Sequence, residues 1–235
     1  PALTRRAFSC PHGNRRVPAR TIADCDMPLQ NRVTPEGEIV ASAARGLMMG
    51  NRGGALHDAQ KRLGRRRWVS KQWICCQLAF NDRHRQVMTP GRYTELFFLD
   101  EATALAAGHR PCFECRRQDF LWFATLWAGT VGREGRATAP EMDGVLQAER
   151  VGRDGAKVLH HAPFDSLPSG TFVRLDGQPY LVLGDRLALW TPEGYAAPRE
   201  RPRHGQAEVL TPRTLVTVLA AGFCPTLHPS AEVGM

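Results

Sequence analysis

Lysine is scarce in this sequence, although the net charge is strongly positive. Of the 31 basic residues only Lys61, Lys71 and Lys157 are lysines, so 31 minus 3 leaves 28 arginines, and the formal net charge is +8. Arginine presents a planar fork of N–H donors that matches phosphate and carboxylate, so a polyanionic partner is credible. A general preference for arginine in the source organism would give the same count, so charge alone does not identify a partner.

Long apolar runs are also missing. No stretch approaches the roughly 20 apolar residues needed to cross a bilayer, and the N-terminal residues lack the apolar segment of a secretory signal. We therefore expect a cytoplasmic protein with no membrane partner. The seven cysteines are odd in number and unevenly spread, which argues against a disulfide framework and favours reduced thiols. The sequence does not indicate an oligomeric state.

The most informative stretch is residues 95–117, ELFFLDEATALAAGHRPCFECRR. Asp100 is a plausible N-cap, residues 102–107 are strong helix formers, and Gly108 supplies the left-handed residue that ends a helix. A second helix is expected over residues 118–127. The pattern predicts two short helices separated by a tight turn.

Cys112 and Cys115 occupy that turn. Two thiols separated by two residues can both reach one tetrahedral Zn²⁺, so the turn supplies half of a zinc site. Two reduced thiols packed under a helix are the simplest alternative. A zinc deaminase would need His-x-Glu or Cys-x-Glu before Cys112, and neither is present. A redox dithiol is opposed by Glu114, whose charge disfavours a neighbouring thiolate.

This stretch resembles a known family. Residues 97–102, 106–112 and 115–116 are similar to the second half of the metal-binding domain of the Ada DNA-repair protein. The resemblance covers roughly residues 95–117. It implies a small α+β unit in which four cysteines hold one Zn²⁺ and which contacts the DNA backbone. The chain also resembles conserved bacterial proteins of unassigned function, which implies no activity.

The remaining ligands must come from other segments. The family's earlier cysteines are three residues apart, whereas Cys75 and Cys76 are adjacent here, within a strand expected over residues 68–80. Adjacent residues of a strand point to opposite faces, so at most one of these thiols ligates the metal. We expect Cys76, or else Cys75, as the third ligand. His84, His109 or a residue from elsewhere would be the fourth.

Arginines near these segments are the expected phosphate contacts. The densest cluster precedes Trp68, and others flank the cysteine turn; the candidates are Arg65, Arg66, Arg67, Arg110, Arg116 and Arg117. The glycine-rich residues 46–57 can also form an anion nest closed by Arg52, although a plain chain reversal explains them as well. The sequence thus predicts a zinc-stabilised protein that binds DNA or RNA.

Two alternatives belong to other functional classes. His160, His161 and Asp165 offer the best acid–base group in the chain and suggest a metal-dependent hydrolase or nuclease. A solvated turn explains the same three residues without any chemistry. A protein-interaction module without catalysis is the remaining hypothesis.

The predicted fold is α+β, with small antiparallel meanders, a few short helices and a zinc-ribbon-like or Ada-like centre. Four regions are expected: an irregular arm with a hairpin and a Gly-rich loop (1–65), an Ada-like strand, helix and cysteine unit (66–130), a linker (131–157), and a β meander with a C-terminal helix (158–235). The central unit is expected to contain a meander of strands over 68–80, 84–88 and 93–98.

The hairpin is expected around a turn at residues 35–37. The second meander is expected over residues 171–190. The linker includes a possible short helix from Pro140 to Arg150, and the last helix is expected over residues 211–221.

Overall fold

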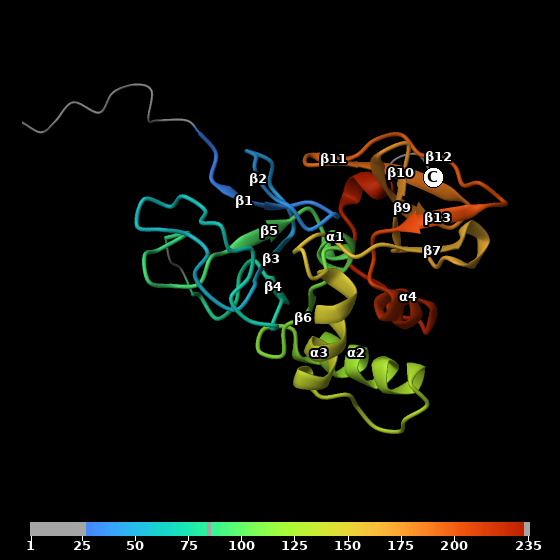
Figure 1. The fold of residues 1–235 in the computed structure, drawn as a ribbon, viewed down its shortest axis with the longest axis horizontal. Helices are drawn as coiled ribbons and strands as arrows, with labels where there is room; N and C mark the ends of the chain where they lie inside the picture. The colour runs from blue at the N-terminus through green and yellow to red at the C-terminus, as the bar shows by residue number, and fades with distance from the viewer. Residues whose placement is uncertain (1–26, 84–85, 233–235) are drawn as a thin grey trace, which may run out of the picture.

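Two β-sheets lie side by side, with α1 (Glu101–Ala106) between them and α2 (Arg117–Thr130), α3 (Ala139–Arg150) and α4 (Arg213–Ala220) below (Figure 1). The structure is a computed structural model and describes residues 27–83 and 86–232. Its mixture of sheets and helices agrees with the α+β class. Within the described ranges, no helix has both the length and the apolar character needed to span a membrane. The expectations for residues 1–26 and for His84 lie outside the described residues.

The first sheet has six strands in the order β2-β1-β5-β3-β4-β6. Its strands are β1 (Gln30–Val33), β2 (Ile39–Ala41), β3 (Met48–Asn51), β4 (Ile74–Gln77), β5 (Leu96–Phe98) and β6 (Arg110–Pro111). β1 and β2 form the predicted antiparallel hairpin, in which Gly37 adopts a φ of +87° at the turn. The β1–β5 and β4–β6 pairs are parallel, which brings segments distant in sequence together.

The glycine-rich residues 46–57 include a strand as well as a chain reversal. Met48–Asn51 build β3, a central strand that pairs antiparallel with both β4 and β5. Gly50 is required in this strand, because a Cβ at that position would lie 2.1 Å from the backbone oxygen of Ile74. The glycines here serve close packing of strands, which a turn-based interpretation of the sequence misses.

The meander predicted for residues 68–98 is also wrong. The strand expected over residues 68–80 is only four residues long, Ile74–Gln77. Residues 86–88, the described part of the expected returning strand, contain no strand. β5 therefore pairs with β3 and β1 instead of following β4 in a meander.

The second sheet is antiparallel, in the order β11-β10-β9-β8-β13-β7, with β12 also paired to β10. Its strands are β7 (His160–Pro163), β8 (Phe172–Leu175), β9 (Gln178–Leu183), β10 (Arg186–Thr191), β11 (Gly194–Tyr195), β12 (Arg199–Glu200) and β13 (Gln206–Val209). The meander predicted over residues 171–190 is confirmed as β8, β9 and β10, with turns at Asp176–Gly177 and Gly184.

The helices are α1 (Glu101–Ala106), α2 (Arg117–Thr130), α3 (Ala139–Arg150) and α4 (Arg213–Ala220), with short 3₁₀ helices at Phe164–Ser166 and Pro229–Ala231. α3 lies within the segment expected to be a linker. Its Met142 and Leu146 pack in one core cluster with residues of α2 and α4. Thr138 and Glu141 form a capping box that fixes where α3 begins.

α1 is the centre of the molecule, and all six of its residues are buried. Ala104 packs in the cluster of the first sheet, Ala102 and Ala106 in the cluster of the second, and Leu105 among the other helices. Alanine side chains are small enough for two sheets and a helical layer to approach the same short helix. The alanine-rich sequence of this segment therefore reflects packing on every side.

Asp100 links the start of α1 to distant parts of the chain. Its side chain accepts from the backbone N–H of Thr103 at 2.8 Å, as expected of an N-cap. Its other oxygen accepts from the hydroxyl of Tyr195 at 2.7 Å and from the backbone N–H of His228 at 3.1 Å. The second sheet and the C-terminal segment are thereby fixed to α1.

Candidate metal centre

Three cysteine side chains gather on one side of the first sheet. The sulfur atoms of Cys76, Cys112 and Cys115 all lie within 4.8 Å of one another. Cys76 and Cys112 are buried, and Cys115 is partly exposed. In the part of the chain that the structure describes, this thiol trio is the one group of three or more Cys, His, Asp or Glu donors with such spacing.

Strand pairing brings the trio together. β6 lies parallel to β4, with Ile74 opposite Arg110 and Cys75 opposite Pro111, so Cys76 and Cys112 are the next neighbours in this register. The backbone N–H of Cys112 donates to the carbonyl of Cys75 at 2.9 Å and extends the pairing by one bond. The turn after Cys112 then places Cys115 just before α2, which begins at Arg117.

Backbone amides point at two of the sulfur atoms. The N–H groups of Glu114 and Cys115 donate to the sulfur of Cys112, and that of Gln77 donates to the sulfur of Cys115. Hydrogen bonds from the Cys115 and Cys76 thiols, together with these amides, lower the pKa of Cys112. The surroundings therefore favour a thiolate at Cys112, which is the form of cysteine that binds a metal. Hydrogen bonds to Cys112 raise the pKa of the Cys76 and Cys115 thiols, whose protons a metal ion would displace on binding.

The donor set fits zinc. A tetrahedral Zn²⁺ with Zn–S bonds of about 2.3 Å places its sulfur ligands roughly 3.8 Å apart. The sulfur atoms of the trio lie within 4.8 Å, so a contraction on the order of 1 Å per pair is enough to bind the ion. Thiolate sulfur selects soft or borderline metals and excludes Mg²⁺ and Ca²⁺.

Cys75 points to the other face of β4, as alternation along a strand requires. It is fully buried in the core cluster of the first sheet, where its sulfur accepts from Arg116 at 3.7 Å. Burial raises the pKa of this thiol. Of the two adjacent cysteines, only Cys76 is therefore placed to ligate a metal with Cys112 and Cys115.

His109, considered as a fourth ligand, is not near the trio. It is fully buried, and its ring centroid lies 5.1 Å from that of Trp73 and 4.6 Å from that of Phe98. Desolvation by burial, followed by the positive charge of Arg52, lowers its pKa well below the ordinary value. The imidazole is thus a neutral packing group within the core.

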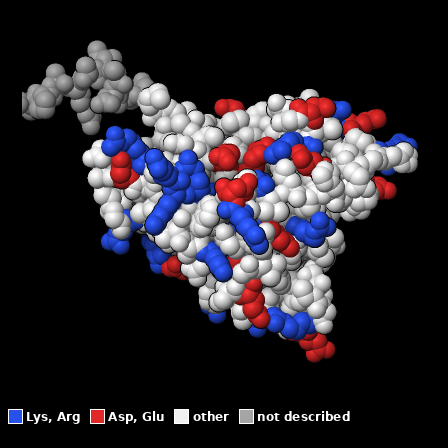
Figure 2. All heavy atoms as spheres, in the orientation of Figure 1, with Lys and Arg blue, Asp and Glu red and all other residues white. Residues whose placement is uncertain are grey.

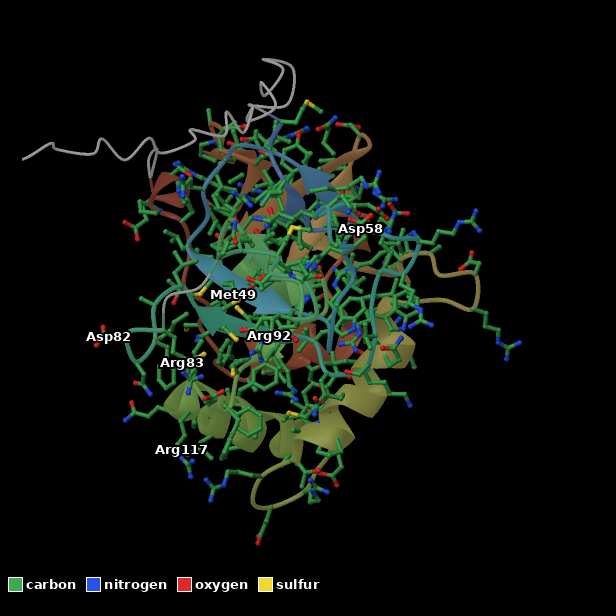
Figure 3. The ribbon with its side chains drawn as sticks, turned by 90° about the vertical axis from the view of Figure 1, so that its left-hand side faces the viewer. Met49, Asp58, Asp82, Arg83, Arg92 and Arg117 are labelled. Carbon is green, nitrogen blue, oxygen red and sulfur yellow. The ribbon has the colours of Figure 1, made fainter. Side chains whose placement is uncertain are left out.

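The trio lines one wall of a cleft of about 580 Å³. Its remaining lining combines apolar side chains with charged ones: Glu95 is buried, and the exposed Arg83 and Glu114 form an ion pair at 2.8 Å. Figure 3 faces the side of the molecule on which Met49, Asp82 and Arg83, three residues of this lining, are labelled. This cleft cannot be predicted from local sequence patterns, because its lining comes from β3, β4, β5 and the loops around them.

Two of the six arginines expected to bind phosphate instead form ion pairs with carboxylates inside the protein. Arg110 is 3% exposed and donates to both carboxylate oxygens of Asp143, at 2.9 and 2.8 Å. Arg116 is 5% exposed and pairs with Glu101 at 2.6 Å and with Asp119 at 2.8 Å. Neither side chain faces solvent, so the prediction that these two contact phosphate is corrected. Their partners lie on α3, α1 and α2, which the local sequence around them does not indicate.

The other four arginines lie at the surface. Arg65 and Arg66 are exposed, and with the partly exposed Arg67 they line a cleft of about 610 Å³ beside Trp68. Arg117 is exposed and lies over the ring of Phe113 at 4.5 Å. Figure 2 shows that basic side chains gather into one large patch on the left half of the visible face, whereas acidic and basic groups alternate over the rest.

His160, His161 and Asp165 do not form one site. His160 and His161 are neighbours on β7 and therefore point to opposite sides of the strand, the first half-buried and the second exposed. His160 lies with Nε2 3.0 Å from the backbone oxygen of Thr211, and burial lowers its pKa. Asp165 is exposed on the 3₁₀ helix after β7. These three side chains therefore do not face one position at which a substrate could bind.

Comparison with protein-family models, with curated proteins and with solved structures finds no match for this chain.

Proposed function

We propose that the chain is a zinc-binding protein whose metal is held by Cys76, Cys112 and Cys115, and that it binds nucleic acid through arginine-to-phosphate contacts. The observation that carries the proposal is the convergence of three sulfur atoms from two separate segments. The amides directed at Cys112 and Cys115 support it, because outer hydrogen bonds of this kind accompany thiolate–metal bonds. An Ada-like or zinc-ribbon-like centre is part of the same proposal.

Three protein donors leave one position of a tetrahedral ion for a further ligand. Structural zinc sites close this position with a fourth side chain, whereas catalytic sites keep it for water or substrate. The cleft beside the trio gives either kind of ligand access. In both cases the ion would tie β4 to the turn before α2, and the free energy of binding would add to the stability of the fold.

The nucleic-acid part of the proposal rests on surface charge. Arg65, Arg66 and Arg67 offer three neighbouring guanidinium groups beside the exposed side chain of Val69 and the ring of Trp68. Phosphate contacts of this kind are independent of base sequence and weaken as salt is added, because bound counterions are released. We therefore expect affinity for DNA or RNA without marked sequence preference.

Elemental analysis tests the metal. The purified chain should contain about one zinc per chain, and Cys112→Ser should lose most of it. Cys224→Ser is the matched control, since Cys224 is exposed and lies outside the trio. Absence of zinc in the wild-type chain after reconstitution, or full retention of it in Cys112→Ser, would contradict the proposal.

Salt dependence tests nucleic-acid binding. Replacing Arg65, Arg66 and Arg67 together by alanine should weaken binding of a single-stranded oligonucleotide and reduce the slope of log affinity against log salt by about 2 to 3. The control replaces three other exposed arginines, Arg136, Arg203 and Arg213, and removes the same charge. Equal losses in both triple variants would indicate a general charge effect and no defined surface.

A further inference from the structure

A second group of buried side chains lies away from the thiols and is strongly basic. Arg52 and Arg150 are each only 1% exposed. Their guanidinium carbons lie over the ring of Trp73, at 3.9 and 4.0 Å from its centroid. The ammonium of Lys157 donates to the backbone carbonyl of Ala106 nearby. We call Arg52, Arg150 and Lys157 the buried basic cluster.

The hydrogen-bond acceptors around this cluster are neutral. Arg52 donates to the carbonyls of Gly37 at 2.9 Å and Arg67 at 3.3 Å, and its Nε lies 3.4 Å from Nε2 of His109. Arg150 donates to the carbonyls of Gly108 at 2.7 Å and Lys71 at 2.6 Å and to the side chain of Gln147 at 2.8 Å.

Both guanidinium groups lack a counter-charge in direct contact. Neither Arg52 nor Arg150 has a carboxylate within ion-pair distance among the described residues. The Nε of Arg150 is buried with no hydrogen-bond partner there. Burying a charge without a counter-charge is unfavourable, so an anion bound here would be strongly stabilised.

A small cavity of about 40 Å³ lies against the cluster. Its charged lining is Arg52, Arg67, Arg150, Lys157, Glu36 and Glu38, so basic groups outnumber acidic ones by four to two. The volume corresponds to roughly three water positions, which is the size of one tetrahedral oxyanion. The two glutamates oppose an anion, and Glu38 is the more exposed of them.

The cavity adjoins the larger cleft of Arg65, Arg66 and Arg67. Arg67, Trp68 and Gly155 line both spaces. The arrangement is a small basic recess at the side of an open basic cleft. A terminal group can enter such a recess, whereas a group in the middle of a polymer would need room for chain on both sides.

We propose that the buried basic cluster binds one phosphate group of a phosphomonoester, while the Arg65–Arg67 cleft receives the rest of the ligand. A phosphomonoester carries close to two negative charges at neutral pH and several acceptor oxygens, which suit the free Nε of Arg150 and the ammonium of Lys157. The phosphate can come from the end of a nucleic-acid strand or from a free nucleotide. The site needs neither zinc nor a long polymer, so it goes beyond the function proposed above.

Inorganic phosphate is the first probe. Calorimetric titration at constant ionic strength, with chloride as the reference anion, should show one phosphate bound per chain and a rise in Tm. Lys157→Met should weaken this binding at least tenfold, and Glu38→Gln should tighten it. Arg67→Gln provides a second weakening variant at a partly exposed position if Lys157→Met does not fold. Phosphate that stabilises no better than chloride, or variants that all bind equally, would overturn the proposal.

The source of the phosphate is tested with three ligands. An oligonucleotide with a 5′-phosphate should bind more tightly than the same strand with a 5′-hydroxyl, and Lys157→Met should remove the difference. A nucleoside monophosphate that binds as tightly as the phosphorylated strand would support the site with the free nucleotide as its ligand. Equal affinity for the phosphorylated and hydroxyl ends in the wild-type chain, together with no binding of the nucleoside monophosphate, would overturn the proposal.

Discussion

At the scale of single residues, Arg110 and Asp143 show how the cysteine turn is fixed to the helices. Their two hydrogen bonds join β6, which leads into Cys112, to α3, and both side chains are almost fully buried. A buried ion pair of this kind adds little stability over an apolar pair of the same shape. Removing one partner, however, leaves an uncompensated buried charge.

Asp143→Asn should therefore be strongly destabilising. We expect the free energy of unfolding to fall by about 3 to 5 kcal/mol, because Arg110 keeps its charge and loses its counter-charge. Denaturant unfolding monitored by circular dichroism gives this value. The double variant Arg110→Met/Asp143→Leu should recover most of the loss. A loss below about 1 kcal/mol in Asp143→Asn would show that the pair is not buried in solution.

Lys157 makes stability depend on pH in a defined direction. Desolvation by burial, followed by the charge of Arg52, lowers the pKa of Lys157 to about 7 from its ordinary 10.5. Between these values the unfolded chain binds more protons than the folded chain, so the stability contribution of Lys157 rises as pH increases from about 7 to 10.5. Below pH 7 the folded state carries the full cost of the buried ammonium.

The difference in unfolding free energy between the wild-type chain and Lys157→Met isolates this effect. Measured by denaturant unfolding from pH 6.5 to 9.5, the difference should move in favour of the wild-type chain as pH rises. Other titrating groups are common to both proteins and cancel in the subtraction. A difference that is flat, or that falls with pH, would mean that the ammonium of Lys157 is solvated.

At the scale of elements, α1 has no free side on which to enlarge a side chain. Ala102, Ala104 and Ala106 are each 0% exposed and lie between the two sheets and the helices. Extra methylene groups at such positions force neighbouring side chains out of their preferred rotamers. The tolerance of α1 to substitution should therefore be lower than that of any surface helix.

Ala106→Leu tests this packing. We expect it to lower the free energy of unfolding by about 1 to 3 kcal/mol, since three added carbon atoms have no space. Ala148→Leu is the matched control, because Ala148 is an exposed position of α3 where leucine costs almost nothing. Thermal unfolding of the two variants should differ by several degrees. Equal Tm values would contradict the buried position of α1.

Local signals in the sequence predicted those elements whose structure is set locally. Asp100 and Gly108 mark the ends of α1, and the turns at Gly37 and Gly177 give the hairpin and the second meander. β3 was missed because its glycines make room for neighbouring strands, a requirement that appears only once the sheet is assembled. The parallel β1–β5 and β4–β6 pairs join distant segments and leave no periodic signal.

In the candidate site, too, some features depend on local sequence and others on distant segments. The spacing of Cys112 and Cys115 predicts that their thiols lie close together, and alternation along one strand predicts that Cys75 and Cys76 point to opposite faces. Which of these two joins the pair is decided by the pairing of β4 with β6, which the sequence does not indicate. The burial of Arg110 and Arg116 could not be predicted, because an arginine that pairs inside a protein and one that faces solvent look alike in sequence. The carboxylates that decide between these roles come from other elements.

At the scale of the whole molecule, a bound ion would hold together one part of the chain more than the other. The trio joins β4 to the start of α2, whereas the second sheet contributes no donor to it. Local stability differs across a structure, and removing a ligand takes away the stabilisation that it gives to the elements it joins. The first sheet should therefore depend on metal and the second should not.

Chelation followed by hydrogen exchange tests this difference. Removing metal should increase exchange at β4, β6 and the first turn of α2 by at least tenfold, while β8, β9 and β10 should keep their protection. Restoring zinc should reverse the change, and Mg²⁺ should not. Uniform loss of protection throughout the chain would indicate that the two sheets unfold as one unit.

Two neighbouring cysteines allow the identity of the metal ligands to be tested. Cys75 and Cys76 are adjacent on β4 and both buried, but only the sulfur of Cys76 belongs to the trio. Zinc content should fall to near zero in Cys76→Ser and stay near one ion per chain in folded Cys75→Ser. Equal zinc content in the two variants, or loss in Cys75→Ser alone, would show that Cys76, Cys112 and Cys115 do not hold the metal.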